Sequence, residues 1–376
     1  MATSKIGSKI GGDSERAART IALPGVGTEG QRALEAARVA VVGAGGLGSP
    51  VLQYLAGAGV GTIGVVDFDR VDVSNLHRQV IHQTASVGDL KTASAVRFIA
   101  ALNPDVRVVE HPLRLDRDNA LDLLRDYDIV VDASDTFATR YLVSDCAALL
   151  RIPCVWGSVL QFDGQAGVFW EGAPDGTSVD FRDLHPAPPD LDQVLSCSEA
   201  GVLGSLCGTI GSLMATDTLK LITGVGRVEL GRVQDVDALA GTWREFRVRR
   251  SPDRVPVTRL IDYDAFCGDV RAGERRGSAS ELTVEEFVAR RASGITVIDV
   301  REPHEHELGH LDGDLLVPLA TLLADPRLAG EGPVVVYCAT GARSATAAAA
   351  LVRAGIPAVS LRGGFTAWRV GNATQR

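Results

Sequence analysis

The fold is decided by residues 38–48, which read Arg38-Val39-Ala40-Val41-Val42-Gly43-Ala44-Gly45-Gly46-Leu47-Gly48. A short run of β-branched residues is followed by closely spaced glycines, and residues 49–58 then carry apolar side chains at helical spacing. The pattern predicts a strand, a tight turn and a helix. Glycines at such a turn let the backbone approach a phosphate closely, and the helix N-terminus offers it free amides.

An acidic residue follows the next apolar segment, residues 62–66. Asp67 lies where a carboxylate can accept hydrogen bonds from ribose hydroxyls. Up to this point the pattern fits three kinds of protein: a nucleotidyl transferase, a nicotinamide-dependent dehydrogenase, or a protein whose turn is structural and binds nothing.

Charged residues farther along favour nucleotidyl transfer. Arg78 ends the run Ser74-Asn75-Leu76-His77-Arg78, Lys91 begins a helix expected over 91–102, and Asp135 follows an apolar segment at 129–131. Cations offset the charge of a triphosphate, and a carboxylate can hold magnesium across it, whereas hydride transfer needs neither. Each cation alone could be a solvated surface charge, but the set together predicts an ATP site.

The alternation of strands and helices predicts an α/β fold with a Rossmann-like parallel sheet and helices on both faces. After Pro153 we expect strands at 154–160 and 166–170, a Pro-rich loop over 172–189, a helix over 206–222, and shorter strands at 227–230 and 242–248. A first domain is expected over 1–267, a linker over 268–280, and a smaller α/β domain over 281–376.

The composition limits the classes of function. The chain has 376 residues, which favours two domains, and a net charge of -9, which argues against a nucleic-acid partner. It has no apolar run like that of a membrane span or signal peptide, so a cytoplasmic protein without a membrane partner is expected. Its six cysteines show no Cys-x-x-Cys spacing and are expected to be reduced.

The second domain has a cysteine loop of its own. Cys338 follows the apolar segment 334–337, and the small residues up to Arg343 precede a helix expected over 343–354. Backbone amides around such a sulfur stabilise an anion. Four residues separate Cys338 from Arg343, where cysteine phosphatases have five, and the smaller loop suits a persulfide sulfur.

The first domain resembles the homodimeric sulfur-carrier adenylyltransferases of the ubiquitin-activating superfamily. The resemblance covers nearly all of residues 15–270, through the motifs at 23–27 (Leu23-Pro24-Gly25-Val26-Gly27), 43–49, 67–69 and 74–76. It implies adenylation of the C-terminal glycine of a small ubiquitin-fold protein ending in Gly-Gly. It assigns the nucleotide site to Gly43, Gly45, Gly46, Gly48, Asp67, Asp69, Asn75, Arg78, Gln79 and Lys91, with Arg78, Lys91 and Asp135 also catalytic.

The same resemblance makes further assignments. It implies that Asp135 coordinates Mg²⁺ and that Arg19 reaches into the nucleotide site of the partner subunit of a homodimer. Many relatives bind a structural zinc through two Cys-x-x-Cys pairs, but this chain has Ser178-Val179-Asp180-Phe181 and Cys267-Gly268-Asp269-Val270 near those places, so no zinc is expected. Cys197 resembles the family's loop cysteine, which is implicated in covalent or reductive steps with the sulfur carrier.

Residues 281–370 resemble a rhodanese domain. The matching motifs are Asp299-Val300-Arg301-Glu302-Pro303, Gly309-His310 and the segment 361–368, together with the Cys338 loop. An adenylyltransferase domain followed by a rhodanese domain in one chain resembles the MoeZ-type family. This resemblance implies a Cys338 persulfide that converts the adenylated carrier to a thiocarboxylate, as in molybdopterin biosynthesis. The sulfur donor is then thiosulfate or a cysteine desulfurase. The alternative is an ATP-binding sulfur-sensing protein without adenylation turnover.

Overall fold

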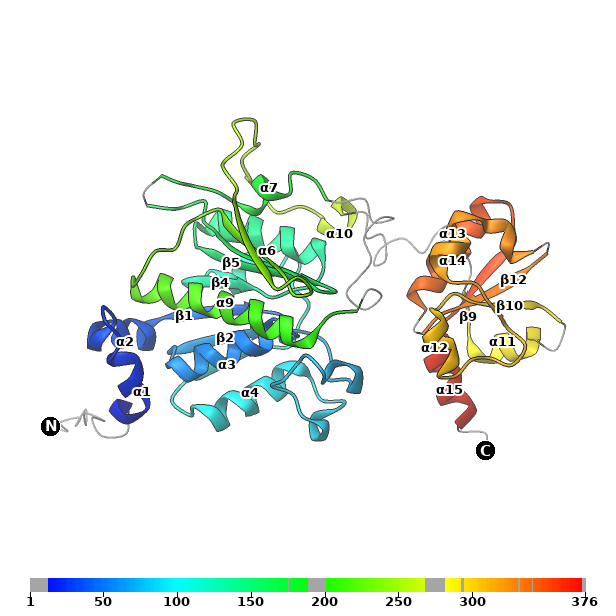
Figure 1. The fold of residues 1–376 in the computed structure, drawn as a ribbon, viewed down its shortest axis with the longest axis horizontal. Coiled ribbons are helices and arrows are strands. Elements are labelled where there is room, and N and C mark those ends of the chain that lie inside the picture. The colour runs from blue at the N-terminus through cyan, green and yellow to red at the C-terminus, as the bar shows by residue number, and fades with distance from the viewer. Residues whose placement is uncertain are drawn as a thin grey trace. The chain divides into compact units, whose positions relative to one another are not determined.

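The computed structural model describes residues 13–174, 176–188, 201–267, 281–291, 294–330, 332–339 and 341–373. The chain divides into two compact units, Met1–Val270 and Arg271–Arg376, and each is described by itself (Figure 1). The linker expected over 268–280 and the loop cysteine Cys197 both lie outside the described residues.

Unit 1 is built on an eight-stranded sheet in the order β3-β2-β1-β4-β5-β6-β7-β8. The parallel part consists of β1 (Arg38–Val42), β2 (Thr62–Val66), β3 (Arg107–His111), β4 (Ile129–Asp132) and β5 (Cys154–Leu160). The antiparallel part consists of β6 (Asp163–Phe169), β7 (Arg232–Asp237) and β8 (Thr242–Arg247). The parallel strands are those that the β-α-β pattern predicts.

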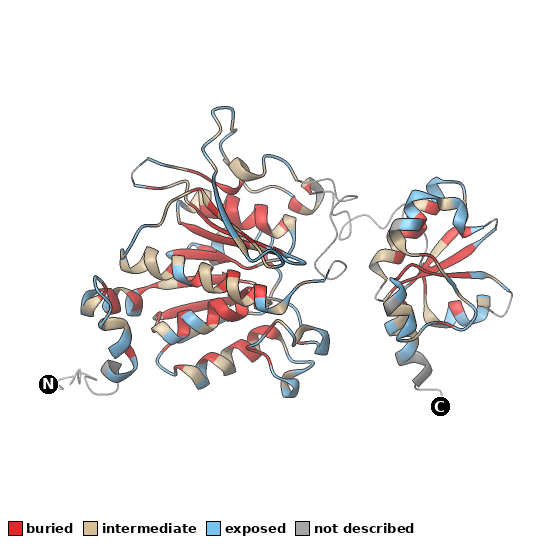
Figure 2. Cartoon of the chain, viewed as in Figure 1, coloured by how far each residue is buried: buried red, intermediate tan, exposed pale blue. Residues whose placement is uncertain are grey.

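Helices cover both faces of this sheet. Alternate residues of β1 point to opposite faces, so Val39 and Val41 belong to one apolar cluster and Ala40 and Val42 to another. On the first face lie α3 (Gly48–Ala58), α4 (Lys91–Leu102) and α9 (Gly204–Thr223); on the second lie α5 (Ala120–Leu124) and α6 (Phe137–Leu150). Figure 2 shows the buried residues concentrated in the strands and on the inner sides of these helices.

Shorter helices complete unit 1. They are α1 (Asp13–Ile21), α2 (Gly27–Ala36), α7 (Phe181–Leu184), α10 (Tyr263–Phe266) and the 3-10 turns η1 (Val73–Asn75) and η2 (Thr84–Ser86). Within the described residues, no helix is long and apolar enough to cross a membrane.

The prediction of a strand at residues 227–230 is wrong. This segment forms no strand, and β7 begins at Arg232, after a turn at Gly231 with a φ of 72°. Glu229 explains the difference, because its carboxylate pairs with Arg232 and Arg247 and holds the segment as an irregular connection to the sheet.

Unit 2 is a smaller parallel sheet in the order β11-β10-β12-β13-β9. Its strands are β9 (Glu281–Leu282), β10 (Thr296–Asp299), β11 (Leu315–Leu316), β12 (Val334–Tyr337) and β13 (Ala358–Leu361). Its helices are α11 (Val284–Arg291), α12 (Pro303–Glu307), α13 (Leu319–Ala324), the 3-10 turn η4 (Pro326–Ala329), α14 (Ala342–Arg353) and α15 (Gly364–Ala373). Val334 and Val336 join one apolar cluster and Val335 and Tyr337 the other, so this sheet too is covered on both faces.

Candidate active sites

A cleft opens in unit 1 at the carboxyl ends of β1, β2 and β4. It encloses about 1000 Å³, part of which is open solvent. The expected site residues that line it are Gly43, Gly45, Gly46, Asp67, Asp69, Arg78, Gln79, Lys91 and Asp135. Such an edge of a parallel sheet is where α/β proteins bind nucleotides.

The glycine turn at this edge leaves no room for side chains at two positions. Gly43 has a φ of 98°, and a Cβ there would lie 2.8 Å from the carbonyl oxygen of Ala133. A Cβ on Gly48 would lie 1.9 Å from the carbonyl oxygen of Gly43. Gly48 does not line the cleft. A glycine is required there because the chain passes close to the Gly43 carbonyl where α3 begins.

Asp67 fastens the glycine turn to the end of β2. One carboxylate oxygen accepts from the Ala44 amide and the other from the Asp69 amide, each at 2.8 Å. Burial raises the pKa of this carboxyl, and the nearby Lys91 ammonium opposes that shift. The side chain thus orders the turn as well as lining the cleft.

Lys91 brings a largely buried cation to the cleft. Its Nζ lies 2.8 Å from Oδ2 of Asp69, and the side chain of Lys91 is 8% exposed whereas that of Asp69 is 51% exposed. The buried ammonium therefore has one exposed carboxylate partner, an arrangement from which it can turn to a phosphate oxygen.

Gln79 has an unused polar atom in the wall of the cleft. The residue is 3% exposed, and its Oε1 accepts no hydrogen bond from any residue that the structure describes. Its Nε2 lies 3.5 Å from the position that a Cβ on Gly45 would take. A buried amide oxygen without a donor is costly, so this atom fits a ligand that supplies one.

The structure places two expected residues away from the cleft wall. Asn75 is half-buried in η1, where its Nδ2 lies 3.5 Å from the Ser74 hydroxyl, and it does not line the cleft. Arg19 is exposed on α1 and does not line this cleft either.

Several polar residues of the cleft were not predicted from the sequence. Arg114, Thr136, Thr139 and Arg140 also line it. Arg140 is 6% exposed, and its Nε has no hydrogen-bond partner among the described residues. Arg140 lies five residues after Asp135, in the first turn of α6. This position beside the predicted site is the signal that could have identified it.

Around the positions of the family's cysteine pairs, this chain packs aromatic and paired charged groups. Phe181 is buried, with its ring 5.2 Å from that of Tyr141 and 5.5 Å from that of Trp156. Beside it, Arg182 forms two hydrogen bonds of 2.8 and 2.7 Å with the buried carboxylate of Asp145. Cys267 is buried as well.

In unit 2, the turn after β12 encloses the sulfur of Cys338. The residue is 1% exposed, the Gly341 amide donates to its Sγ at 3.1 Å, and the Ser344 hydroxyl lies 3.6 Å from the same atom. Gly364 allows the turn to close, because a Cβ there would lie 2.3 Å from the Cys338 carbonyl oxygen. This arrangement can stabilise an anionic sulfur.

Two ion pairs hold the segments around this loop. Arg343 forms two hydrogen bonds of 2.7 Å with Glu305 of α12. Arg301 is bonded through Nε and Nη2 to Asp299, and Nη2 also donates to the Gly309 carbonyl at 2.8 Å. Asp299 and Arg301 are both buried.

Comparison with known proteins gives two family matches. Residues 17–257 match the ThiF family and residues 283–370 match the rhodanese-like domain. A protein of Mycobacterium tuberculosis named probable adenylyltransferase/sulfurtransferase MoeZ is 48% identical over 360 residues, which cover 94% of this chain and 92% of that protein. A sulfur carrier protein adenylyltransferase of Thermus thermophilus is 52% identical over 262 residues, 68% of this chain and 96% of that protein.

Solved structures show the same fold at lower identity. PaaA matches with a TM-score of 0.55 and 22% identity, over 67% of this chain and 79% of its own. Escherichia coli MccB, solved with ATP, matches with a TM-score of 0.53 and 21% identity, over 61% of this chain and 68% of its own.

Proposed function

The chain belongs to the ThiF family and carries a rhodanese-like domain, and from this premise we propose that it converts the C-terminal carboxylate of a small sulfur-carrier protein into a thiocarboxylate. The family matches and the names of the relatives support adenylyl transfer and sulfur transfer by one chain. The observation that carries the finer proposal is the presence of both sites: a nucleotide cleft with a buried cation, and a cysteine held in an amide turn.

Adenylation comes first because a carboxylate resists nucleophiles. In the proposed step, a carboxylate oxygen of the carrier's terminal glycine attacks the α-phosphorus of ATP, and pyrophosphate leaves. Lys91 and Arg78 line the cleft and offset the charge on the phosphates, while the glycine turn admits them close to the backbone. The resulting acyl-adenylate has AMP as its leaving group.

Asp135 suits a magnesium ion at this site. Its carboxylate is exposed at the cleft, and Mg²⁺ prefers hard oxygen ligands. When bound, Mg²⁺ neutralises charge on the triphosphate. Asp135 would hold the cation, and Lys91 would turn from Asp69 to a phosphate oxygen.

Sulfur enters at Cys338. The Cys338 thiolate takes a sulfur atom from a donor such as thiosulfate, which leaves as sulfite, or from the persulfide of a cysteine desulfurase. The terminal persulfide sulfur then attacks the carbonyl carbon of the acyl-adenylate, and AMP departs. The product is an acyl disulfide between Cys338 and the carrier.

A thiolate must then reduce this acyl disulfide. We assign the step to Cys197: its sulfur attacks the Sγ of Cys338, a disulfide forms between the two cysteines, and the carrier leaves as a thiocarboxylate. An external thiol reduces the disulfide. Without added reductant, Cys197→Ala should accumulate a carrier adduct on Cys338, visible in the intact mass and released by a small thiol, whereas free thiocarboxylate at the wild-type rate would overturn the assignment.

ATP-pyrophosphate exchange with candidate carriers ending in Gly-Gly tests the proposal. We expect exchange that depends on the carrier. Tight ATP binding without exchange for any carrier would instead support the alternative, an ATP-binding sulfur-sensing protein.

A further inference from the structure

We propose that His306, His310 and Asp314 form a binding site in unit 2 for a divalent cation of the zinc class. The atoms by which these side chains could bind a metal all lie within 4.8 Å of one another. Two imidazoles and one carboxylate are ligands that Zn²⁺ accepts. No step of the proposed sulfur-transfer cycle uses them.

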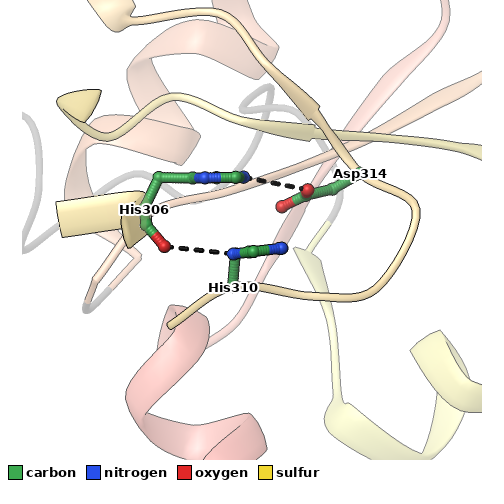
Figure 3. A group of neighbouring side chains, drawn as sticks. All are labelled: His306, His310 and Asp314. Atoms are coloured by element: carbon green, nitrogen blue, oxygen red, sulfur yellow. Dashed lines mark hydrogen bonds and ion pairs between the residues drawn. The ribbon is translucent and has the colours of Figure 1, made fainter. Parts of the chain in front are cut away.

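One short segment of the chain supplies all three side chains. His306 is in the last turn of α12, His310 follows four residues later, and Asp314 precedes β11. The two imidazole rings are stacked, with centroids 3.9 Å apart and planes inclined by 6°. Figure 3 shows the Asp314 carboxylate beside the outer end of the His306 ring, with the His310 ring below it.

Hydrogen bonds determine which atoms of His310 and Asp314 are available to a metal. Nδ1 of His310 lies 3.1 Å from the His306 carbonyl oxygen, to which it can only donate, so the lone pair of the neutral ring is on Nε2. Oδ2 of Asp314 accepts from the Tyr337 hydroxyl, which leaves Oδ1 facing His306. Metal-binding histidines typically donate their second ring N–H to a carbonyl or carboxylate in this way.

The spacing also suits a small cation. Nε2 of His306 and Oδ1 of Asp314 are 3.1 Å apart, and ligands about 2.1 Å from a tetrahedral zinc are separated by roughly 3.4 Å. His310 is exposed, so its ring can turn to close the remaining distance. Binding at His306 Nε2 displaces the proton it shares with Asp314, which moves to Nδ1 or to solvent.

Three protein ligands leave a coordination position for water. With one ligand exposed, we expect the cation to exchange with solvent and to be removed by a chelator. This distinguishes the site from the closed, four-thiolate structural zinc site that the sequence of unit 1 lacks.

Zinc titration of the untagged, chelator-stripped, full-length chain tests the proposal by calorimetry. We expect one Zn²⁺ per chain at this site and at least tenfold weaker binding in His310→Ala, which should fold normally because His310 is exposed. Asp314→Asn should weaken binding too, while Asp312→Asn, which changes an exposed carboxylate in the same loop, should bind as the wild type does.

Cobalt spectroscopy excludes binding to the cysteines. Bound Co²⁺ should show weak ligand-field bands without the intense charge-transfer band of a thiolate, and His310→Ala should lose them. The proposal is overturned if the wild-type chain binds neither cation, if His310→Ala binds zinc as tightly as the wild type, or if the cobalt spectrum is that of a thiolate site unchanged by His310→Ala.

Discussion

Asp132 is the last residue of β4, Asp135 lies three residues beyond it, and the two carboxylates have different surroundings. Asp132 is 1% exposed and accepts two hydrogen bonds from Ser134, and burial raises the pKa of its carboxyl. Asp135 is exposed and lines the cleft. The first carboxylate therefore shapes the turn, and the second is accessible to a cation.

Asp135→Asn should abolish carrier-dependent pyrophosphate exchange and leave thiosulfate sulfurtransfer intact. Removing the carboxylate removes charge stabilisation in the transition state, and the expected loss is on the order of 100-fold or more. Asp118→Asn is the matched control, because Asp118 is exposed and lies outside the cleft. Near-normal exchange in Asp135→Asn would refute the assigned role.

His82 supports the glycine turn from behind. It is 5% exposed, and its Nε2 donates to the Ala44 carbonyl at 2.9 Å while its Nδ1 lies 2.9 Å from the Ser94 hydroxyl. Burial lowers the pKa of this imidazole from its usual 6.5, and the Lys91 ammonium adds to the shift against the opposing bond to Ala44.

This depressed pKa makes unit 1 sensitive to acid. Below pH 6.5 the unfolded chain binds more protons at His82 than the folded chain does. The contribution of His82 to the free energy of unfolding is therefore complete above that pH, and it is lost as the pH falls through the lower pKa of the folded state. The free energy of unfolding should therefore fall over the interval below pH 6.5. The side chain of His82→Gln can still donate to the Ala44 carbonyl but does not titrate, so the free energy of unfolding of this variant should fall less over that interval than that of the wild type. Chemical denaturation at each pH measures the difference. An equal fall in both proteins would exclude the contribution of His82.

At the scale of the elements, the sequence was informative where strands are apolar and buried. The first strand, its glycine turn and α3 could be predicted because β-branched, glycine and helical patterns adjoin there. The sequence did not indicate β7, because Gln234 and Asp235 interrupt the apolar pattern of that strand. The two-residue strands β9 and β11 are too short to show a period.

The candidate sites were predictable to a similar extent. Lys91 was expected in the nucleotide site from its spacing, and it lines the cleft. Cys338 was expected in a turn of backbone amides, and the Gly341 amide donates to it. Arg114 could not be predicted, since it enters the cleft through a loop with no motif of its own. The cluster around His306 also depends on a loop that returns Asp314 to the end of α12.

The segment around α7 leads to a prediction about zinc. Phe181 and the Arg182–Asp145 pair fill this region without four thiolates, and Tyr263 donates to Asp145 at 2.6 Å, which ties α10 to α6. We expect a chelator to leave the thermal unfolding of unit 1 unchanged. Chelator-treated protein that retains about one zinc per chain by elemental analysis, or that unfolds when zinc is removed, would contradict this.

At the scale of the whole molecule, the family resemblance implies a homodimer in which Arg19 reaches into the partner's nucleotide site. Arg19→Ala and Asp135→Asn should each be inactive in exchange. In a mixed dimer, one site combines an intact Asp135 with an intact Arg19 from the other subunit, and the second site lacks both. Random pairing makes about half of the dimers mixed, so co-expression should restore about a quarter of the wild-type exchange. Failure to recover activity, with mixed dimers demonstrated by mass, would rule out the shared site.

The proposed cycle requires both units, with activation in unit 1 preceding sulfur delivery from unit 2. Cys338 takes no part in forming the acyl-adenylate, so the two chemistries can be separated by one substitution. In Cys338→Ala, pyrophosphate exchange should survive while thiosulfate sulfurtransfer disappears.

The most direct test of the central claim is the intact mass of the carrier after incubation with the chain, ATP, Mg²⁺, thiosulfate and a reductant. With the wild-type chain, the carrier should gain the mass of one sulfur and lose that of one oxygen. With Cys338→Ala it should keep its original mass although pyrophosphate exchange continues. Formation of the thiocarboxylate by Cys338→Ala at the wild-type rate would contradict the account.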